Sequence, residues 1–503
     1  MSPKGLVDPS KLETRLFINN EFVNAESGKT FPSLNPATEE VITHVQEADK
    51  ADIDKAVAAA VAAFDLGSEW RGMDGTARRD LMLKFVELVE RDRAFLEELE
   101  CMDNGKPVGR LGMYGSSVDL ELLIRVYKYF AGWADKITGK VIPVDGNMLC
   151  YTRKEPIGAC GLIVPWNYPL LMIAWSLAPA LAAGCTVVIK TSEKTPLAAL
   201  HMAKLFREAG FPPGVINVVS GYGPTAGQAL ARHPDIGKIG FTGSTATGHK
   251  IMQYAAESNL KKVTLELGGK SPMIVFDDAD IETAISAAHV GLFLNQGQCC
   301  CAGSRLFVQE GIYDKFVAAA IEKAKSIKIG AYTEDTSDTV PIEQGPQVDS
   351  LQFEKVLGYI EKGKEEGATV ACGGGRHGDK GYFVQPTVFT DVKDDMTIAK
   401  EEIFGPVMSI LKFKTDEEVI ERANKTAYGL GAGICSANGA RAVSAAHQIR
   451  AGTVWINTFD NFDAAAPFGG FKKSGIGRTK GEDSLDCWLE TKCVMMPLQG
   501  PKC

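Results

Sequence analysis

The sequence has no surplus of basic residues and no long apolar run, and each absence excludes a class of protein. It holds 54 Lys and Arg against 63 Asp and Glu, a formal net charge of −9. An acidic chain offers no general attraction for nucleic acid or an anionic membrane. The longest apolar run, 169–183, contains Ser176 and Pro179 and is too short to span a bilayer. We therefore expect no nucleic-acid partner and no membrane partner.

No apolar leader, internal repeat or low-complexity tract is visible either. The first residues, 1–5, run directly into polar sequence, unlike a secretory signal. Twelve cysteines are scattered along the chain. Three of them, 299–301, are adjacent, and pairing within such a triplet is geometrically poor. We expect reduced thiols and a cytoplasmic location.

The 503 residues exceed what one domain usually holds, so two or three domains are expected. Apolar residues at three- and four-residue spacing predict helices over 51–64 and 76–100. From about residue 157, short apolar runs alternate with helical stretches, which is typical of βαβ units on a parallel sheet. The predicted strands are 159–164, 186–190, 216–219, 238–241 and 263–267, and the predicted helices are 196–209, 225–232 and 248–257.

A second α/β series follows from about residue 273. Its predicted strands are 273–276, 306–308, 369–372, 407–413 and 453–456, with a helix over 312–327. Two α/β lobes in sequence predict a cleft between them. Ligands usually bind in such folds at the carboxyl ends of the strands.

Two turns that follow predicted strands carry residues suited to a nucleotide. Gly243 and Ser244 end one strand and open a helix, where free N–H groups would favour a pyrophosphate. The turn lacks the GxGxxG fingerprint, and an ordinary capped turn explains it equally well. Lys190 and Glu193 could bind the two hydroxyls of a ribose, although a solvated loop pair is the commoner arrangement.

Three further segments carry candidate catalytic groups. Glu266 stands in an apolar strand; if it is buried, its pKa should rise, which suits a general base. Cys300, which follows a glycine and precedes helix-compatible sequence, is predicted near a helix N-terminus that favours its thiolate. Asn167, between Pro165 and Pro169, could donate to an oxyanion. The alternatives are a carboxylate bonded to backbone groups, a small buried thiol and an Asn that caps its own turn.

Taken together and in this order, the motifs resemble those of the aldehyde dehydrogenase superfamily. The resemblance runs from residue 16 to about residue 497 and is nearest to the class 1/2 tetramers of the cytosol and mitochondria. The motifs that carry it are Pro165-Trp166-Asn167, Glu266-Leu-Gly-Gly-Lys270, Gly297-Gln-Cys-Cys300, Glu343-Gln-Gly-Pro-Gln-Val-Asp349, Lys400-Glu-Glu402-Ile-Phe404-Gly-Pro and Pro467-Phe-Gly-Gly.

The resemblance implies an α/β fold with three parts. These are a Rossmann-like parallel-sheet NAD-binding domain over 1–136 and 154–270, an α/β catalytic domain over 271–480, and a small β oligomerisation domain over 137–153 and 481–503. It also implies a homotetramer, a dimer of dimers, with a dimer as the fallback. The segment 137–153 and a strand near 490–496 would form the sheet that bridges subunits.

The implied activity is NAD-dependent oxidation of a small-molecule aldehyde to a carboxylic acid, without a metal. By similarity, the Cys300 thiolate attacks the aldehyde carbon, and the Asn167 side chain with the Cys300 N–H holds the oxyanion. Hydride loss leaves a thioester, and Glu266 activates the water that hydrolyses it. The cleft would exclude water from the hydride step.

The resemblance also implies two sets of binding residues. Those for NAD are Ile163, Pro165, Trp166, Lys190, Glu193, Gly223, Gly243, Ser244, Gly248, Leu267, Gln352, Lys355, Glu402 and Phe404. Those that line the substrate tunnel are Tyr168, Met172, Trp175, Leu294, Phe462 and Phe468. Glu193 would repel a 2′-phosphate and so favour NAD over NADP. Phe462 would narrow the tunnel and favour small or aliphatic aldehydes over retinal.

The sequence departs from the family pattern at Ser176 and Thr479. The family has a lysine and a glutamate there, which pass protons between the general base and solvent. Their loss would slow thioester hydrolysis by ~10²–10⁴-fold, unless water, Lys480 or Lys473 compensates. A second hypothesis is therefore a structural protein, because omega-type crystallins of invertebrate eye lenses share this fold with little or no activity. Retention of Cys300 and Glu266 favours the enzyme.

Overall fold

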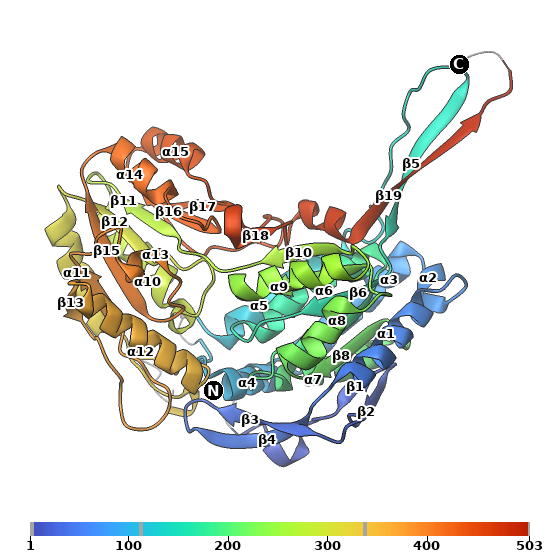
Figure 1. Ribbon diagram of the computed structural model, residues 1–503, viewed down its shortest axis with the longest axis horizontal. Helices are drawn as coiled ribbons and strands as arrows, with labels where there is room; N and C mark the ends of the chain where they lie inside the picture. The colour runs from blue at the N-terminus through green and yellow to red at the C-terminus, as the bar shows by residue number, and fades with distance from the viewer. Residues whose placement is uncertain (1–4, 110–113, 335–339, 501–503) are drawn as a thin grey trace.

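The computed structural model describes residues 5–109, 114–334 and 340–500, and its first lobe is built on an eight-stranded sheet (Figure 1). The strands are β1 (Leu16–Ile18), β2 (Glu21–Val23), β6 (Ala159–Ile163), β7 (Thr186–Thr191), β8 (Ile216–Ser220), β9 (Lys238–Thr242), β10 (Lys262–Glu266) and β18 (Gly475–Ile476). Their order is β18-β10-β9-β6-β7-β8-β1-β2. The five central strands run parallel, which confirms the predicted βαβ series.

The second lobe is built on a seven-stranded sheet, parallel except at β13. Its strands are β11 (Pro272–Val275), β12 (Arg305–Gln309), β13 (Thr369–Cys372), β14 (Thr387–Thr390), β15 (Val407–Phe413), β16 (Gly431–Cys435) and β17 (Thr453–Ile456). Their order is β13-β14-β15-β12-β11-β16-β17. Five of these strands match the prediction. β14 and β16 were not predicted; β16 carries two glycines, which are disfavoured in strands.

Helices cover both sheets (Figure 1). They are α1 (Lys50–Phe64), α2 (Glu69–Gly72), α3 (Gly75–Arg91), α4 (Arg93–Asn104), α5 (Ser116–Ala131), α6 (Pro169–Ala183), α7 (Leu197–Ala209), α8 (Gln228–Arg232), α9 (Thr245–Glu257), α10 (Ile281–Phe293), α11 (Tyr313–Lys325), α12 (Ser350–Glu365), α13 (Thr397–Lys400), α14 (Asp416–Asn424) and α15 (Gly439–Gln448). Within the described parts of the chain, no helix has the length and apolar character needed to cross a membrane.

One predicted helix is wrong in its extent. The pattern over 76–100 predicts a single helix, but the structure ends α3 at Arg91 and begins α4 at Arg93. Asp92 lies between them with φ −93° and ψ 12°, and its carboxylate bonds His201 at 2.8 Å. The break between α3 and α4 is therefore stabilised by a residue 109 positions away in the sequence. The local spacing of apolar residues does not predict this contact.

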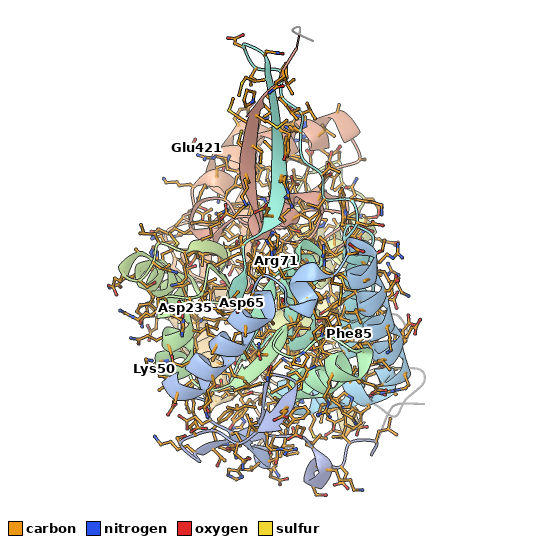
Figure 2. The ribbon with its side chains drawn as sticks, turned by 90° about the vertical axis from the view of Figure 1, so that its right-hand side faces the viewer. Lys50, Asp65, Arg71, Phe85, Asp235 and Glu421 are labelled. Carbon is orange, nitrogen blue, oxygen red and sulfur yellow. The ribbon has the colours of Figure 1, made fainter. Side chains whose placement is uncertain are left out.

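Two antiparallel ribbons complete the fold. β5 (Met148–Pro156) pairs along its whole length with β19 (Leu489–Pro497). This ribbon rises away from the body of the molecule (Figure 2). The second ribbon joins β3 (Thr30–Asn35) to β4 (Glu40–Gln46). The pairing of β19 confirms the predicted C-terminal strand. The expectation of no leader rests partly on residues 1–4, which lie outside the described residues.

The edge of the first sheet brings a strand from the middle of the sequence together with a strand from its C-terminal part. β18 pairs with β10, so that Glu266 lies opposite Gly475. After β18 the chain passes Thr264, and in the following turn, residues 477–480, the Thr479 hydroxyl reaches the Glu266 carboxylate at 3.4 Å. The strands β6, β7 and β9 end at the same edge because they run parallel to β10.

Candidate active site

The candidate nucleophile lies in a tight turn between η3 (Leu294–Gly297) and β12. Three successive residues, Asn295, Gln296 and Gly297, have left-handed backbone angles with φ between 52° and 72°. A Cβ at Gly297 would lie 2.2 Å from the carbonyl of Gly405, so only glycine fits there. Two adjacent non-glycine residues in this region store backbone strain, which the surrounding packing must hold.

The prediction that Cys300 lies at a helix N-terminus is wrong. The chain passes from the turn directly into β12 at Arg305, so no helix dipole favours the thiolate. Hydrogen bonding to Cys299 raises the pKa of the half-buried Cys300 thiol well above its ordinary value, and burial and the charge of Glu266 act in the same direction. The direction of this shift favours the thiol over the thiolate, so a base close to the sulfur would assist its attack.

Glu266 ends β10 and is only 4% exposed. Its Oε1 accepts a hydrogen bond from Thr479 Oγ1 at 3.4 Å, while Oε2 has no hydrogen-bond partner among the described residues. Burial raises the pKa of Glu266 well above its usual range, against the opposing effects of Arg478 and Thr479. The predicted rise is confirmed. A carboxyl of this kind can accept a proton near neutral pH.

Two glycines after Glu266 allow three functional segments to meet. A Cβ at Gly268 would lie 2.3 Å from Glu402 Oε2, and one at Gly269 would lie 2.4 Å from the Cys300 carbonyl oxygen. The Gly269 N–H donates to Glu402 Oε1 at 3.1 Å. The backbone beyond Glu266 is thus in contact with both the nucleophile loop and Glu402.

Asn167 is buried at the start of α6 and faces the nucleophile loop. Its Nδ2 donates to the Gln298 carbonyl at 3.0 Å, rather than to its own turn. Its carbonyl accepts from Asn295 Nδ2 at 2.9 Å and from Lys106 Nζ at 3.0 Å. The side-chain amide is therefore held next to the cysteine triplet from both sides.

Lys106 is a supporting residue that the sequence reasoning did not identify. It is fully buried, and its Nζ lies 2.5 Å from Asp119 Oδ2 and 3.6 Å from Glu100 Oε1. Burial lowers the pKa of Lys106, but the two carboxylates outweigh it and hold that pKa above its ordinary value. Only the run of polar residues over 103–106, at the end of α4, could have signalled a buried charge here.

The predicted nicotinamide-side residues cluster around Phe404, which has φ +62°. Gln352 Nε2 donates to the Phe404 carbonyl at 2.6 Å, and the Trp166 ring meets the Phe404 ring edge-on at 5.3 Å. Burial raises the pKa of Glu402. Lys355 lies exposed on α12.

The predicted adenosine-side residues lie at the carboxyl ends of β7 and β9. Lys190 is 4% exposed, with its Nζ 3.5 Å from Glu193 Oε2. Ser244 caps α9 by accepting from the Thr247 N–H at 3.2 Å, and Gly243 precedes it. Ile163 and Pro165 lie at the end of β6, Gly223 is exposed after β8, and a Cβ at Gly248 would lie 2.7 Å from Leu267.

Three of the predicted tunnel residues form one aromatic cluster. The Trp175 ring lies 5.6 Å from Phe462 and 5.3 Å from Phe468, and those two rings are 5.7 Å apart. Tyr168 and Met172 are buried on the N-terminal side of Trp175, and Leu294 is half-buried at the start of η3. Lys480 Nζ lies over all three rings of the cluster, a contact that sequence reasoning missed.

Comparison with known proteins assigns this arrangement to a family. The aldehyde dehydrogenase family profile matches residues 22–494. The chain belongs to the aldehyde dehydrogenase family. It is 56% identical over 486 residues to "Aldehyde dehydrogenase, mitochondrial" of Rattus norvegicus, which covers 97% of this chain and 92% of the relative. It is 53% identical to "Aldehyde dehydrogenase 1A1" of Mus musculus, over 99% of this chain and 97% of the relative.

Solved structures give the same result for the fold. The "NAD+ complex structure of aldehyde dehydrogenase from bacillus cereus" has a TM-score of 0.93 and 51% sequence identity, and it covers 97% of each chain. This agreement confirms the α/β fold class, with its largely parallel sheets. The protein is an NAD-dependent aldehyde dehydrogenase, and its cofactor is NAD.

The described residues fit NAD. The Lys190–Glu193 pair lies at the carboxyl end of β7, which is where groups that bind ribose hydroxyls are expected in such a fold. The capped start of α9 presents free N–H groups of the kind that bind a pyrophosphate, and Thr245 Oγ1 there is buried without a hydrogen-bond partner among the described residues.

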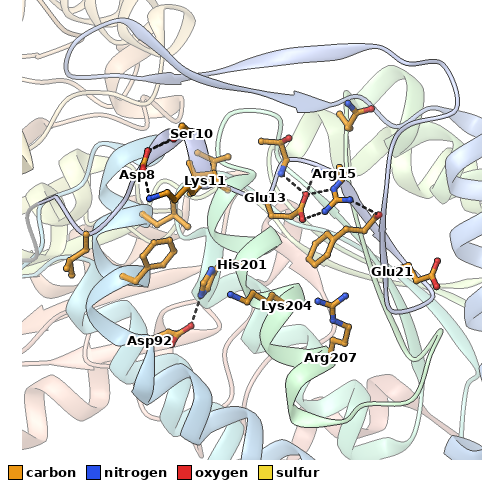
Figure 3. A pocket seen from close by; sticks show the side chains of 18 of the residues that line it. Asp8, Ser10, Lys11, Glu13, Arg15, Glu21, Asp92, His201, Lys204 and Arg207 are labelled. Carbon is orange, nitrogen blue, oxygen red and sulfur yellow. Dashed lines mark hydrogen bonds and ion pairs between the residues drawn. The ribbon is translucent and has the colours of Figure 1, made fainter.

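One large cavity in the aldehyde dehydrogenase lies away from these residues. Its volume is about 1240 Å³, and it is bounded by the N-terminal segment, β2 and α7 (Figure 3). His201 bonds Asp92 at its wall, and Lys204 and Arg207 extend from the same helix. None of the predicted site residues lines it. Cavity size is thus a poor guide to the chemistry of this protein.

Proposed function

We propose that this enzyme oxidises a small aldehyde through a covalent thioester on Cys300, with Glu266 as the base. The observation that carries the proposal is the Glu266 carboxyl, buried with a raised pKa and followed by Gly269, whose backbone approaches the Cys300 carbonyl. A protonated thiol and a basic carboxyl in one enclosed site are complementary groups for acid–base and nucleophilic catalysis.

The proposed reaction begins when Glu266 takes the Cys300 proton and the sulfur bonds to the aldehyde carbon. The Asn167 Nδ2 and the Cys300 N–H donate to the resulting oxyanion of the thiohemiacetal. NAD, when bound, supplies the hydride acceptor, and loss of hydride leaves a thioester. Glu266 releases this first proton to solvent and then takes a proton from water as the water oxygen attacks the thioester, and it later returns that proton to the sulfur. The C–S bond breaks, the carboxylic acid leaves, and the thiol regains a proton.

The cofactor residues named above would each have a separate task. Lys190 and Glu193 would bind the adenosine ribose, and the turn Gly243–Ser244 would bind the pyrophosphate. Glu402 would bind the nicotinamide ribose, because its carboxylate is already fixed by Gly269. Phe404 would support the ring, and its own position is fixed through Gln352.

The test is NADH formation by the wild type and three variants. Cys300→Ser should lower turnover by about 10³-fold or more, whereas Cys372→Ser, a half-buried thiol on β13, should not change it. Glu266→Gln should slow steady-state turnover by ~10²–10⁴-fold. Wild-type turnover in Cys300→Ser would refute the assignment of the nucleophile.

A structural role of the omega-crystallin kind is the second candidate. The supporting observation is that Glu266 meets only the Thr479 hydroxyl, while Ser176 on α6 is half-buried. Neither side chain can relay a proton as a lysine and glutamate pair would. Tight NAD binding without turnover, and turnover gained in the double variant Ser176→Lys with Thr479→Glu, would establish this candidate. Ready oxidation of acetaldehyde by the unaltered chain would exclude it.

We also propose a homotetramer in the cytoplasm, with the three domains bounded as the sequence analysis gives them. The projecting β5–β19 ribbon, with Met495 and Met496 half-exposed, supports a subunit contact. Cys299 and Cys301, with sulfurs 3.5 Å apart, would be prone to oxidation outside a reducing compartment. Light scattering on the purified chain tests the assembly.

A further inference from the structure

The aromatic cluster of Trp175, Phe462 and Phe468 encloses a lysine. Lys480 is only 2% exposed. Its Nζ lies 4.5 Å from the ring centroid of Trp175, 4.6 Å from that of Phe462 and 5.6 Å from that of Phe468. An ammonium over three ring faces is stabilised by cation–π attraction. The rings are those proposed to line the aldehyde tunnel, and in that proposal the ammonium would lie beside the substrate.

This ammonium has few hydrogen-bond acceptors. The Asp463 carbonyl accepts from Nζ at a long 3.4 Å. Over residues 5–109, 114–334 and 340–500, no carboxylate oxygen forms an ion pair with Lys480 within 4.0 Å. An ammonium carries three N–H donors. Ring faces stabilise its charge but do not accept directed hydrogen bonds as a carboxylate does.

The site is costly as a purely structural element. An unpaired buried charge is unfavourable, and a methionine would fill nearly the same volume without a charge. The missing component is an anion with oxygen acceptors. In an aldehyde tunnel, the substrate itself can bring one.

We propose that Lys480 binds a carboxylate at the far end of the substrate, and that the enzyme acts on aldehydes of the form ⁻OOC–(CH₂)n–CHO. The inference rests on the proposed function, because it takes the cluster as part of the tunnel. The aldehyde end would lie at Cys300, and the methylene chain would lie along Trp175 and Phe462. Lys480 is in this sense a specificity-determining residue.

The electrostatic state of Lys480 agrees with this role. Burial lowers the pKa of Lys480 to about 8, against the opposing effects of Cys301, Asp463 and Glu266. The amine is thus mostly charged at neutral pH and can pair with a carboxylate. A bound carboxylate would raise this pKa again, which is the stabilisation that an uncharged aldehyde cannot supply.

The test compares aldehydes of equal length that differ only in the terminal group. Wild-type kcat/KM should be about 10- to 100-fold higher for 5-oxopentanoate than for pentanal, as expected for a charge-assisted hydrogen bond in an enclosed site. Lys480→Met should remove this preference, mainly through a higher KM for 5-oxopentanoate. Lys315→Met, at an exposed lysine on α11, should keep the wild-type preference.

The variant Lys480→Arg distinguishes two roles for Lys480, namely pairing with the substrate carboxylate and forming an imine with the aldehyde. Arginine keeps the charge and forms no imine, so this variant should retain most of the preference. A loss as complete as that of Lys480→Met would overturn the proposal. Equal kcat/KM values for pentanal and 5-oxopentanoate in the wild type would also overturn it, while leaving the proposed aldehyde oxidation intact.

A binding measurement without turnover distinguishes the two proposals. Glutarate, titrated calorimetrically into the Cys300→Ser variant, should bind, and adding Lys480→Met should weaken binding by about 10-fold or more. If neither pentanal nor 5-oxopentanoate is oxidised, the proposed function fails. The glutarate titration then decides alone whether Lys480 binds a carboxylate. Binding that depends on Lys480 then supports the anion site, and binding that is absent or unaffected by Lys480→Met overturns it.

Discussion

Two buried lysines stand beside the same substrate path in very different surroundings. Lys106 lies under Asn167, paired with Asp119 and near Glu100, and it binds the Asn167 carbonyl. Lys480 lies among aromatic rings with one distant carbonyl as its acceptor. The first site has its carboxylate partners within the chain, whereas the second has no carboxylate partner within 4.0 Å among the described residues. A buried charge that is paired within the protein can position neighbouring groups. A buried charge that has no partner within the protein is a candidate for binding a ligand of opposite charge.

The difference is visible in the direction of the two pKa shifts. Carboxylates hold the pKa of Lys106 above its ordinary value in spite of burial. Burial brings the pKa of Lys480 down to about 8, because no carboxylate lies close enough to oppose it fully. Four predictions test this contrast.

The largest effect is expected for Lys106→Met. Removing the cation leaves Asp119 and Glu100 buried without compensation, which should lower the free energy of unfolding by about 3–5 kcal/mol. Urea unfolding at pH 7 measures the loss as a lower midpoint with an unchanged slope. A loss below about 0.5 kcal/mol would show that the two carboxyls become neutral at little cost.

The second prediction concerns pH. The pKa of Lys480 is about 8 in the folded chain and 10.5 for an ordinary lysine, so the unfolded chain binds more protons between these values. Stability relative to Lys480→Met should therefore rise with pH across this window, by about 3 kcal/mol in total. Lys106 acts in the opposite sense: its contribution is present below pH 10.5 and is lost as pH rises above its folded pKa. Unfolding curves at several pH values measure both trends, and a flat difference for Lys480→Met would contradict the first.

A smaller effect is expected for Phe462→Leu. The change removes one of the ring faces over Lys480 and should cost about 1–2 kcal/mol of unfolding free energy. In the Lys480→Met background, the cost should fall because no cation remains to be stabilised. A double-mutant cycle gives this coupling directly, and a coupling of zero would mean that the rings act only as packing.

The smallest effect is expected at the surface. Lys492 Nζ pairs with Glu155 Oε2 at 2.6 Å on the projecting ribbon, and the lysine side chain is 58% exposed. Lys492→Met should change the unfolding free energy by less than about 0.5 kcal/mol, because water screens the pair. A loss comparable to that of Lys106→Met would show that the ribbon is buried in an assembly.

Much of the site could be predicted from the sequence where the signal is local. Glu266 stands in an apolar strand, and that pattern predicted both its burial and its raised pKa. Asn167 between two prolines predicted a fixed amide, and its Nδ2 indeed bonds the loop of the nucleophile. Cys300 was placed in the correct loop but beside a helix that does not exist, because glycine before helix-compatible residues also occurs in turns.

The remaining errors and omissions concern contacts between distant segments. The break at Asp92 depends on His201, and the role of Lys106 depends on Asn167, which is 61 residues away. Lys480 lies three residues after Gly477, which ends a glycine-rich stretch, and nothing in the local sequence marks it as enclosed by aromatic rings.

The sequence alone determined most of the parallel strands, several helices, the family and the identity of the catalytic candidates, because periodicity and motifs are properties of neighbouring residues. Only the tertiary structure decided which buried charge has a partner. Desolvation and pairing depend on the segments that surround a group in space. For Lys480 these are α6, which carries Trp175, and the loop that carries Phe462 and Phe468. A lysine therefore positions Asn167 at residue 106, whereas at residue 480 it is the group that we propose binds a carboxylate.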